Sequence, residues 1–250
     1  MQTASTFRDL VIAEGFAIVP QLLSRDEIGR LILTLEALAD SESILKRGGM
    51  FAVRNLLDVS AEVRALAESR AVREVIEEIL GGKARPVRGI LFDKTPDANW
   101  KVPWHQDVTI AVAERSEADG FGPWSLKAGV LHVQPPAFIL ERMLSIRIHL
   151  DPCGAENGAL KVLPGSHRFG RLPEADIARL VTERPGIVCE AEQGDALLMR
   201  PLLLHASSSS ANPAHRRVVH IDYASIELPN GLRWATESAC LPTRSSMVEL

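Results

Sequence analysis

His105 and Asp107 stand two residues apart in the stretch VPWHQDVTIAV. Imidazoles and carboxylates are both common ligands of first-row transition metals. In an extended segment side chains alternate between faces, so these two project to one side and Gln106 to the other. The spacing therefore predicts part of a metal site. On this motif alone the alternative stays open, namely that both side chains are solvated or hydrogen-bonded at the end of a strand.

A third ligand is expected far along the chain, and His205 at the end of the apolar run LLLHAS is the best candidate. A histidine that ends a strand can also be structural. Its position gains weight from Arg216 and Arg217, which open the next predicted strand after a loop of Ser, Asn and Pro, because a hairpin would return one guanidinium beside His205. Two histidines and a carboxylate bind one face of non-heme iron, and a nearby arginine can grip the second carboxylate of a keto-acid cosubstrate.

Helices are predicted for most of residues 1–85, with one strand at FAIVP. Ser24 and Glu27 match a capping box, a sequence pattern that marks the start of a helix. Apolar residues at helical spacing follow it at Ile28, Leu31, Ile32, Leu35 and Leu38. A second helical stretch runs from Val63 to Ile79 and is expected to stop at Gly81. These helices are expected to buttress a sheet.

Short β-rich runs separated by turn residues dominate the chain from residue 86 onward. They are PVRGILFD, VTIAVA, LSIRIHLD, GALKVLPG, GIVCEA, ALLMRPLLLHAS and RRVVHIDYAS. Several short strands with long excursions favour a sandwich or jelly roll. We expect a single domain over 1–250, with a mainly helical part at 1–85, a jelly-roll core at 86–228 and a C-terminal tail at 229–250.

The composition is that of a globular protein, with 46% hydrophobic and 24% charged residues among 250. The net charge of -4 comes from interspersed signs without a basic run, which argues against nucleic acid as a partner. No stretch is apolar and long enough for a membrane span, and the start of the chain does not resemble a signal peptide. Three widely separated cysteines argue against a disulfide framework. These features predict a cytoplasmic protein without a nucleic-acid or membrane partner, and they leave its oligomeric state unknown.

Three further stretches carry a family resemblance: WHQD, LDPCGAENGALKVLPGSHRFG and LLLHASSSSANPAHRRVVHIDYA. With the N-terminal EGFAIVPQLLSRDEI they make the chain resemble the phytanoyl-CoA dioxygenase family, a branch of the Fe(II)- and 2-oxoglutarate-dependent dioxygenases. The resemblance implies a mainly β fold with α-helices, a double-stranded β-helix of the jelly-roll, cupin-like kind with buttressing N-terminal helices. It also implies Fe(II) as the cofactor, with 2-oxoglutarate and O2 as cosubstrates.

Carried over by position, the resemblance makes His105, Asp107 and His205 the iron ligands. It assigns Arg216 and Ser207 to the far carboxylate of 2-oxoglutarate. Gln106 resembles a residue that touches the cosubstrate, although regular alternation would turn it away from the site. Arg217 competes with Arg216, since strand parity alone does not choose between them. Arg216 shares the more polar face of its strand, but the family spacing is the main reason for preferring it.

Five residues are weaker candidates for contact with a substrate. Arg147 and His149 share the polar face of LSIRIHLD, which indicates a strand that either lines a polar cavity or exposes one face. Lys94, His132 and Trp124 flank the segment of His105 and Asp107 and could line a substrate mouth, although each type is often structural.

The resemblance predicts an oxygenase that hydroxylates an aliphatic carbon of a small or medium metabolite with release of succinate and CO2. The carboxylate of Asp107 favours hydroxylation, because related halogenating enzymes lack this ligand to make room for chloride. A cupin-like protein that binds a metal or a ligand without oxidation is the alternative, since a fold alone does not define an activity. A hydrolytic zinc enzyme ranks last, because it has no need of the arginine.

Overall fold

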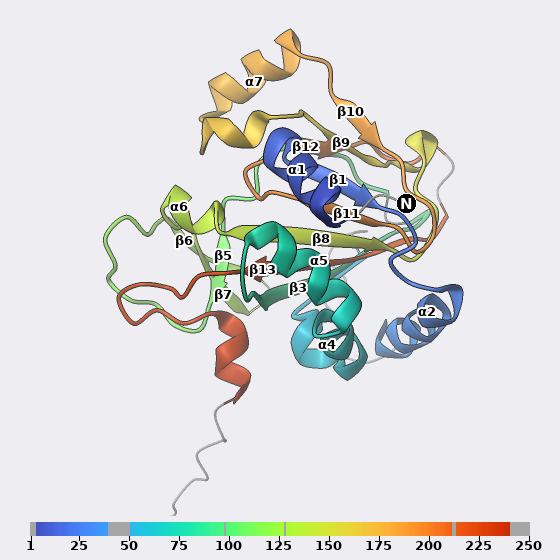
Figure 1. The fold of residues 1–250 in the computed structure, drawn as a ribbon, viewed down its shortest axis with the longest axis horizontal. Coiled ribbons are helices and arrows are strands. Elements are labelled where there is room, and N and C mark those ends of the chain that lie inside the picture. Colours follow the sequence, from blue (N-terminus) through green and yellow to red (C-terminus); the bar gives the residue numbers. More distant parts are fainter. Residues whose placement is uncertain (1–3, 40–50, 98, 128, 212–213, 241–250) are drawn as a thin grey trace, which may run out of the picture.

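Strand β13 (Arg216–Ala224) lies inside the largest sheet of the computed structural model, which describes residues 4–39, 51–97, 99–127, 129–211 and 214–240. The sheet is antiparallel and has the order β1-β11-β8-β13-β3-β2 (Figure 1). We call it the major sheet. Its other strands are β1 (Phe16–Val19), β2 (Phe51–Arg54), β3 (Arg85–Lys94), β8 (Met143–His149) and β11 (Ala196–Met199).

A second antiparallel sheet packs against one face of the major sheet and has the order β10-β9-β12-β4. We call it the minor sheet. Leu160 and Val162 of the minor sheet pack with Leu197 and Met199 of the major sheet in one buried cluster, so the two sheets form a sandwich. Its strands are β4 (Val102–His105), β9 (Leu160–Val162), β10 (Ile187–Cys189) and β12 (His205–Ser207).

A three-stranded meander of order β5-β7-β6 adjoins the sandwich. It packs in a hydrophobic cluster with Trp234, which is fully buried and pairs with Val112 through an isolated bridge. The chain beyond residue 228 therefore still belongs to the packed body at least as far as Trp234. The meander consists of β5 (Ile110–Val112), β6 (Trp124–Lys127) and β7 (Val130–Val133).

The N-terminal helices cover the outer face of the major sheet, where they bury one large hydrophobic cluster. The predicted capping box is present, since the Ser24 N–H donates to Glu27 Oε2 at 2.8 Å and the Glu27 N–H to Ser24 Oγ at 3.4 Å. The second helical stretch breaks in two at Ser69 and ends, as predicted, at Gly81 with a positive φ of 75°. These helices are α1 (Ala4–Glu14), α2 (Arg25–Ala39), α3 (Leu56–Val59), α4 (Ala61–Ala67) and α5 (Arg70–Leu80).

Among the described residues, two further helices and two short 3-10 helices lie in the connections, and a third 3-10 helix follows β13. Figure 1 shows α7 near β10, at the end of the molecule opposite α2 and α4. These elements are α6 (Ala137–Leu140), α7 (Glu174–Glu183) and the 3-10 helices Ala155–Asn157, Ser166–Phe169 and Ala235–Cys240.

The central strands of the major sheet have one apolar and one polar face, because side chains alternate with a period of two. Residues such as Ile146, Val219 and Ile221 face the helices. The opposite face, which we call the inner face, carries most of the polar residues. Its residues pair across strands as Lys94 with Arg216, Phe92 with Val218, Ile90 with His220, Arg88 with Asp222, Arg147 with His220, and Ser145 with Asp222.

Three predictions about the elements are wrong. The N-terminal part contributes β2 in addition to the strand at FAIVP. The run from 196 to 207 is two strands in different sheets, because Pro201 lacks an N–H and interrupts the pairing. No hairpin joins β12 to β13, since β12 belongs to the minor sheet and β13 to the major one. The serine-rich loop therefore crosses between the layers of the sandwich.

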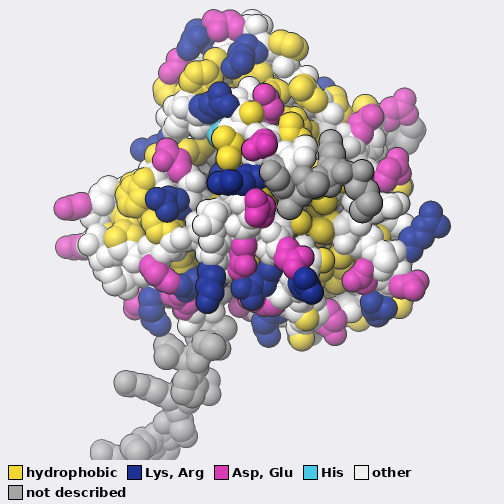
Figure 2. Space-filling model, viewed as in Figure 1, with side chains coloured by type: hydrophobic (Ala, Val, Ile, Leu, Met, Phe, Trp, Pro, Cys, Tyr) yellow, Lys and Arg dark blue, Asp and Glu magenta, His cyan; other side chains and the backbone are white. Residues whose placement is uncertain are grey.

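Basic and acidic side chains alternate over the surface in Figure 2, and no field of one sign dominates that face. Within the described ranges, every helix is too short or too polar to traverse a lipid bilayer.

Replacement of Tyr223 by Phe is expected to lower the free energy of unfolding by about 1 to 2 kcal/mol, since the buried Ala67 carbonyl loses its donor. The Tyr223 O–H donates to that carbonyl at 2.9 Å and is fully buried with it. Urea denaturation measures the change. Thr182→Val is the control, because it removes an exposed hydroxyl that also donates to a backbone carbonyl at 2.9 Å. Equal losses in both variants would contradict the role of burial.

Candidate metal centre

His105, Asp107 and His205 come together at one end of the minor sheet. His105 ends β4 and His205 begins β12, and the two residues pair directly across the antiparallel ladder. Asp107 lies in the loop just after β4, where its backbone N–H donates to the Pro201 carbonyl at 2.9 Å. One potential ligand atom from each residue lies within 4.8 Å of the other two. We refer to these three residues as the triad.

Both histidines of the triad are held in the same tautomer. Nδ1 of His105 lies 2.9 Å from the Pro103 carbonyl, and Nδ1 of His205 lies 2.8 Å from the Leu203 carbonyl. A carbonyl only accepts hydrogen bonds, so the ring proton sits on Nδ1 and leaves the Nε2 lone pair free for a metal. His205 Nε2 lies 3.7 Å from Asp107 Oδ2, and the two imidazole centroids are 4.2 Å apart.

The charge states of the triad suit a cation. Burial lowers the pKa of His205, so its imidazole is neutral at physiological pH, the form that ligates a metal. Burial alone would raise the pKa of Asp107, but His205 and Arg88 outweigh this effect and hold the pKa below its ordinary value. The donor set of two imidazoles and one carboxylate fits iron(II).

Arg216 lies on the inner face of the major sheet and is buried. Its guanidinium donates to the Gly158 carbonyl and lies 3.7 Å from Cys153 Sγ, while its Nε is buried without a partner among the described residues. A buried arginine with an unused donor is suited to a carboxylate. Ser207, two residues beyond His205, is buried and lines the same cavity.

Lys94 lies behind these residues. Its ammonium group donates to the Ser208 carbonyl at 2.5 Å and to Ser207 Oγ at 3.4 Å. Gly158 leaves room for this arrangement, because a Cβ at that position would stand 2.6 Å from the Ser208 carbonyl oxygen and 3.1 Å from Lys94 Nζ. Lys94 is fully buried and is not among the residues that line the cavity, so the structure places it at the Arg216 end instead of at a substrate mouth.

Arg217 points away from the triad. It forms a two-point ion pair with Asp151, with both N···O distances at 2.9 Å, and a third bond to Glu36 at 2.8 Å. Its side chain therefore ties β13 to neighbouring segments on the outer side of the major sheet. This geometry favours Arg216 over Arg217 as the carboxylate-binding residue.

Gln106 is used by the protein's own backbone. Both of its amide hydrogens are donated to carbonyls, to Gly170 at 2.8 Å and to Leu202 at 2.7 Å, and its oxygen accepts from the Leu172 N–H at 2.8 Å. No donor remains on the amide, but Gln106 also lines the cavity of the triad, so its contact with the cosubstrate stays a prediction. Gln106 fixes the loop that carries Asp107 against two other loops.

A hydrogen-bonded chain crosses the inner face of the major sheet. Arg147 donates to His220 Nδ1 at 3.1 Å, and His220 Nε2 donates to Asp222 at 2.9 Å. Asp222 also accepts from Ser145 and from Arg88, each at 2.6 Å. Burial opposes its ionisation, but Arg88 and His220 hold the pKa of Asp222 far below its ordinary value.

The other predicted substrate residues fall in three different places. Arg147 lines the cavity of the triad. His149 lies two residues after Arg147 in β8 and is buried. Both of its ring nitrogens are unpartnered among the described residues, and burial lowers its pKa to about 3. His132 lines a smaller adjoining pocket. Trp124 does not line the cavity, because its ring packs in the hydrophobic cluster of the meander with Arg115 over one face.

The cavity of the triad has a volume of about 330 Å³ and lies between the two sheets of the sandwich. Sequence reasoning missed three of the basic residues that line it, namely Arg54, Arg88 and Lys127. The available signal was a charged residue inside an apolar strand, as with Arg88 in PVRGILFD.

A jelly-roll sandwich with two histidines and one carboxylate at the mouth of its cavity defines the class of non-heme metal-dependent oxygenases. The model of the family described as Phytanoyl-CoA dioxygenase (PhyH) matches residues 13–218. The chain belongs to this family of dioxygenases, as its sequence motifs predict.

Known proteins support the assignment of the fold. An ectoine dioxygenase from Nocardia farcinica is 23% identical in an alignment 246 residues long, and the alignment covers 86% of this chain and 75% of that protein. The epimerase SnoN, solved with Fe3+, alpha ketoglutarate and nogalamycin RO, superposes with a TM-score of 0.69 at 18% identity, covering 91% of each chain. EctD from S. alaskensis, solved with 2-oxoglutarate and 5-hydroxyectoine, gives a TM-score of 0.67 at 19% identity, covering 90% of this chain and 77% of that one.

Substitution of Arg216 by Ala is expected to weaken 2-oxoglutarate binding by more than about tenfold, because a buried charge pair is worth roughly 2 to 5 kcal/mol. Arg216→Lys should recover part of this loss, since an ammonium lacks the planar two-point grip. Calorimetry on the Fe(II)-loaded, oxygen-free protein measures the affinity. Arg217→Ala is the matched control and should lower stability without changing cosubstrate affinity. The reverse pattern would move the site to Arg217.

Lys94 makes the stability of the ligand-free protein depend on pH. Burial, aided by Arg216, lowers its pKa from 10.5 to about 8, so the folded protein releases this proton before the unfolded chain does. The cost of burying the charge is complete below pH 8 and decreases as the pH rises toward 10.5. The unfolding free energy of the wild type relative to Lys94→Met should therefore rise with pH across this window. A constant difference would show that Lys94 is not desolvated.

Proposed function

We propose that the protein is an Fe(II)- and 2-oxoglutarate-dependent oxygenase that hydroxylates an aliphatic carbon of a small or medium metabolite, with release of succinate and CO2. The observation that carries this proposal is Arg216, whose buried guanidinium lines the cavity of the triad and whose Nε–H has no partner among the described residues. A metal site for hydrolysis or for simple metal storage has no use for such a group.

The residues of the cavity would bind the metal at one end and the far carboxylate of the cosubstrate at the other. His105, Asp107 and His205 supply three ligand atoms from one side, which leaves the other positions of the metal for the cosubstrate and oxygen. Arg216 and Ser207 would hold the far carboxylate of 2-oxoglutarate. When iron and 2-oxoglutarate are bound, they supply the oxidative chemistry, in which decarboxylation of the keto acid accompanies oxidation of the substrate.

The protein keeps the reacting region dry and oriented. Phe92, Val108 and Leu160 line the cavity beside the triad and limit the access of water. The loop of Asp107 is anchored by its bond to Pro201 and by the three bonds of Gln106, so the carboxylate is held in place before a metal binds. Such preorganisation is the main contribution that a protein makes to metal-based oxidation.

The comparisons support a small substrate. The ectoine dioxygenase of Nocardia farcinica is named for a small molecule, and the S. alaskensis enzyme was solved with 5-hydroxyectoine. The cavity volume of about 330 Å³ is at the lower end of the range for ligand pockets and has to accommodate cosubstrate and substrate together.

Replacement of Asp107 by Ala is expected to weaken Fe(II) binding by at least about tenfold and to abolish succinate formation, because two imidazoles alone hold the metal poorly against water. Anaerobic titration of the Fe(II) protein with 2-oxoglutarate should give a visible charge-transfer band in the wild type and none in Asp107→Ala. Asp176→Ala, at a half-buried position of α7 outside the cavity, is the control and should behave like the wild type.

The reaction itself is tested by incubating the Fe(II) protein with metabolite pools and 2-oxoglutarate under labelled oxygen gas. A product that gains one oxygen atom from the gas, formed together with succinate, is the expected result. Metal and 2-oxoglutarate binding without any succinate formation would contradict the proposal and favour a binding protein. Product formation without a gained oxygen would indicate a different oxidative outcome.

A further inference from the structure

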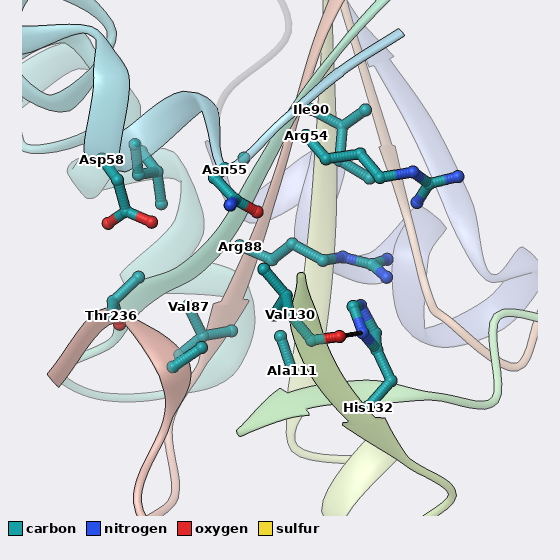
Figure 3. Close-up of a pocket in the computed structure, with 13 residues that line it drawn as sticks. Arg54, Asn55, Asp58, Val87, Arg88, Ile90, Ala111, Val130, His132 and Thr236 are labelled. Atoms are coloured by element: carbon teal, nitrogen blue, oxygen red, sulfur yellow. Dashed lines mark hydrogen bonds between the residues drawn. The ribbon is translucent and has the colours of Figure 1, made fainter. Parts of the chain in front are cut away.

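Three basic side chains from three separate strands converge on the cavity of the triad. Arg54 ends β2, Arg88 lies in β3 and Lys127 ends β6 of the meander, and all three line the cavity. Arg54 and Arg88 also line the smaller adjoining pocket that contains His132. Figure 3 shows the guanidinium groups of Arg54 and Arg88 extending in the same direction, with the His132 ring on that side and Asp58 on the other.

Little in the protein neutralises this group. Arg88 pairs with Asp222, and Lys127 donates to the neutral Thr109 hydroxyl at 3.2 Å. Arg54 makes no hydrogen bond or ion pair within the part of the chain that the structure describes. The cations also repel one another. Burial is the main cause that lowers the pKa of Arg54 and of Lys127, and the charge of Arg88 is the second cause.

The side chains that line the whole cavity carry a net positive charge, like the group of three. Five basic residues line it, the three just described together with Arg147 and Arg216, whereas Asp107 is the only acidic residue among the described residues that line it. Iron(II) and 2-oxoglutarate carry equal and opposite charges, so their binding leaves the balance unchanged. Asp107 and the nearby Asp222 offset two of the five cations. Three positive charges therefore remain for another ligand to meet.

The basic group lies away from the end that would hold the cosubstrate. In the backbone register of β13 and β3, Arg216 lies opposite Lys94 at one end of the ladder. Asp222 lies opposite Arg88, six residues further along β13. At a rise of about 3.3 Å per residue, the two ends are separated by roughly 20 Å of strand. Asp107 lines the same cavity as Arg88 and Arg216. An anion held here would therefore lie at the Arg88 end of the cavity, away from Arg216.

We propose that Arg54, Arg88 and Lys127 form an anion-binding subsite for the substrate, so that this enzyme acts on a small metabolite with a carboxylate, sulfate or phosphate group. This inference depends on the proposed function, because it assigns the substrate class of the same cavity. Paired guanidiniums suit such oxyanions, since each presents a planar fork of donors. Lys127 adds a point charge from the end of β6.

Binding is tested with inorganic sulfate as the probe on the Fe(II) protein saturated with 2-oxoglutarate under anaerobic conditions. Calorimetry should detect sulfate binding to the wild type. Arg54→Gln and Lys127→Gln should each weaken it by roughly ten- to a hundredfold, because a hydrogen bond to a charged group is worth about 1.5 to 3 kcal/mol. Arg54→Lys should retain part of the affinity. Arg30→Gln, at an exposed position of α2, should leave it unchanged.

The chemical class of the substrate is tested with matched pairs of metabolites. Carboxylic acids and phosphate esters are compared with the methyl esters and the alcohols that lack the charge, and succinate release above the substrate-free rate is measured. Stimulation by members of either charged set and not by their neutral partners is the expected result. A preference for one charged set identifies which oxyanion the substrate carries. Equal stimulation by charged and neutral partners would overturn the proposal.

The outcomes separate this inference from the function on which it depends. Thermal unfolding and the charge-transfer band are recorded for every variant, so a folding defect or a lost metal site is recognised. If the band forms but sulfate binds equally to the wild type, Arg54→Gln and Lys127→Gln, the subsite is refuted and the oxygenase stands. If sulfate binding depends on both residues but the band never forms, the proposed function fails, and with it the role of the group in substrate binding.

Discussion

The alternation of side chains along β3, β8 and β13 is the constraint on which the rest of the structure depends. Because successive residues point to opposite faces, the same strands that bury Ile146, Val219 and Ile221 under the helices must present the intervening residues to the cavity. The hydrophobic cluster thereby fixes the register of the strands, and the register fixes where Arg216, His220 and Asp222 stand. A slip of one residue would exchange the two faces.

The minor sheet positions the two histidines of the triad. The pairing of His105 with His205 brings the two imidazoles together, and the carbonyl two residues earlier in each segment sets the tautomer. Strand pairing thus positions two of the three residues of the triad without a bound cation. Asp107 is the exception, since it lies beyond the strand and depends on Pro201 and on its neighbour Gln106 for its position.

Much of this site could be predicted from the sequence, because it depends on short spacings and on a family resemblance. His105, Asp107 and His205 could be named from a short spacing and from the resemblance, and the polar face of β13 follows from local periodicity. What could not be predicted depends on long-range pairing. Arg216 reaches the cavity from the opposite sheet and not through a hairpin, and Lys94 is buried by its pairing with β13. Arg54, Arg88 and Lys127 are single basic residues on three distant strands, and nothing local indicates that they meet.

The spacing of the two sheets sets the distance between the triad and Arg216. The triad belongs to the minor sheet and its loop, and Arg216 belongs to the major sheet, so a molecule that touches both must match the gap between them. Packed sheets stand about 10 Å apart, a distance that side-chain packing holds nearly constant. The hydrophobic contacts between the layers would thus select the length of a dicarboxylate held between the triad and Arg216.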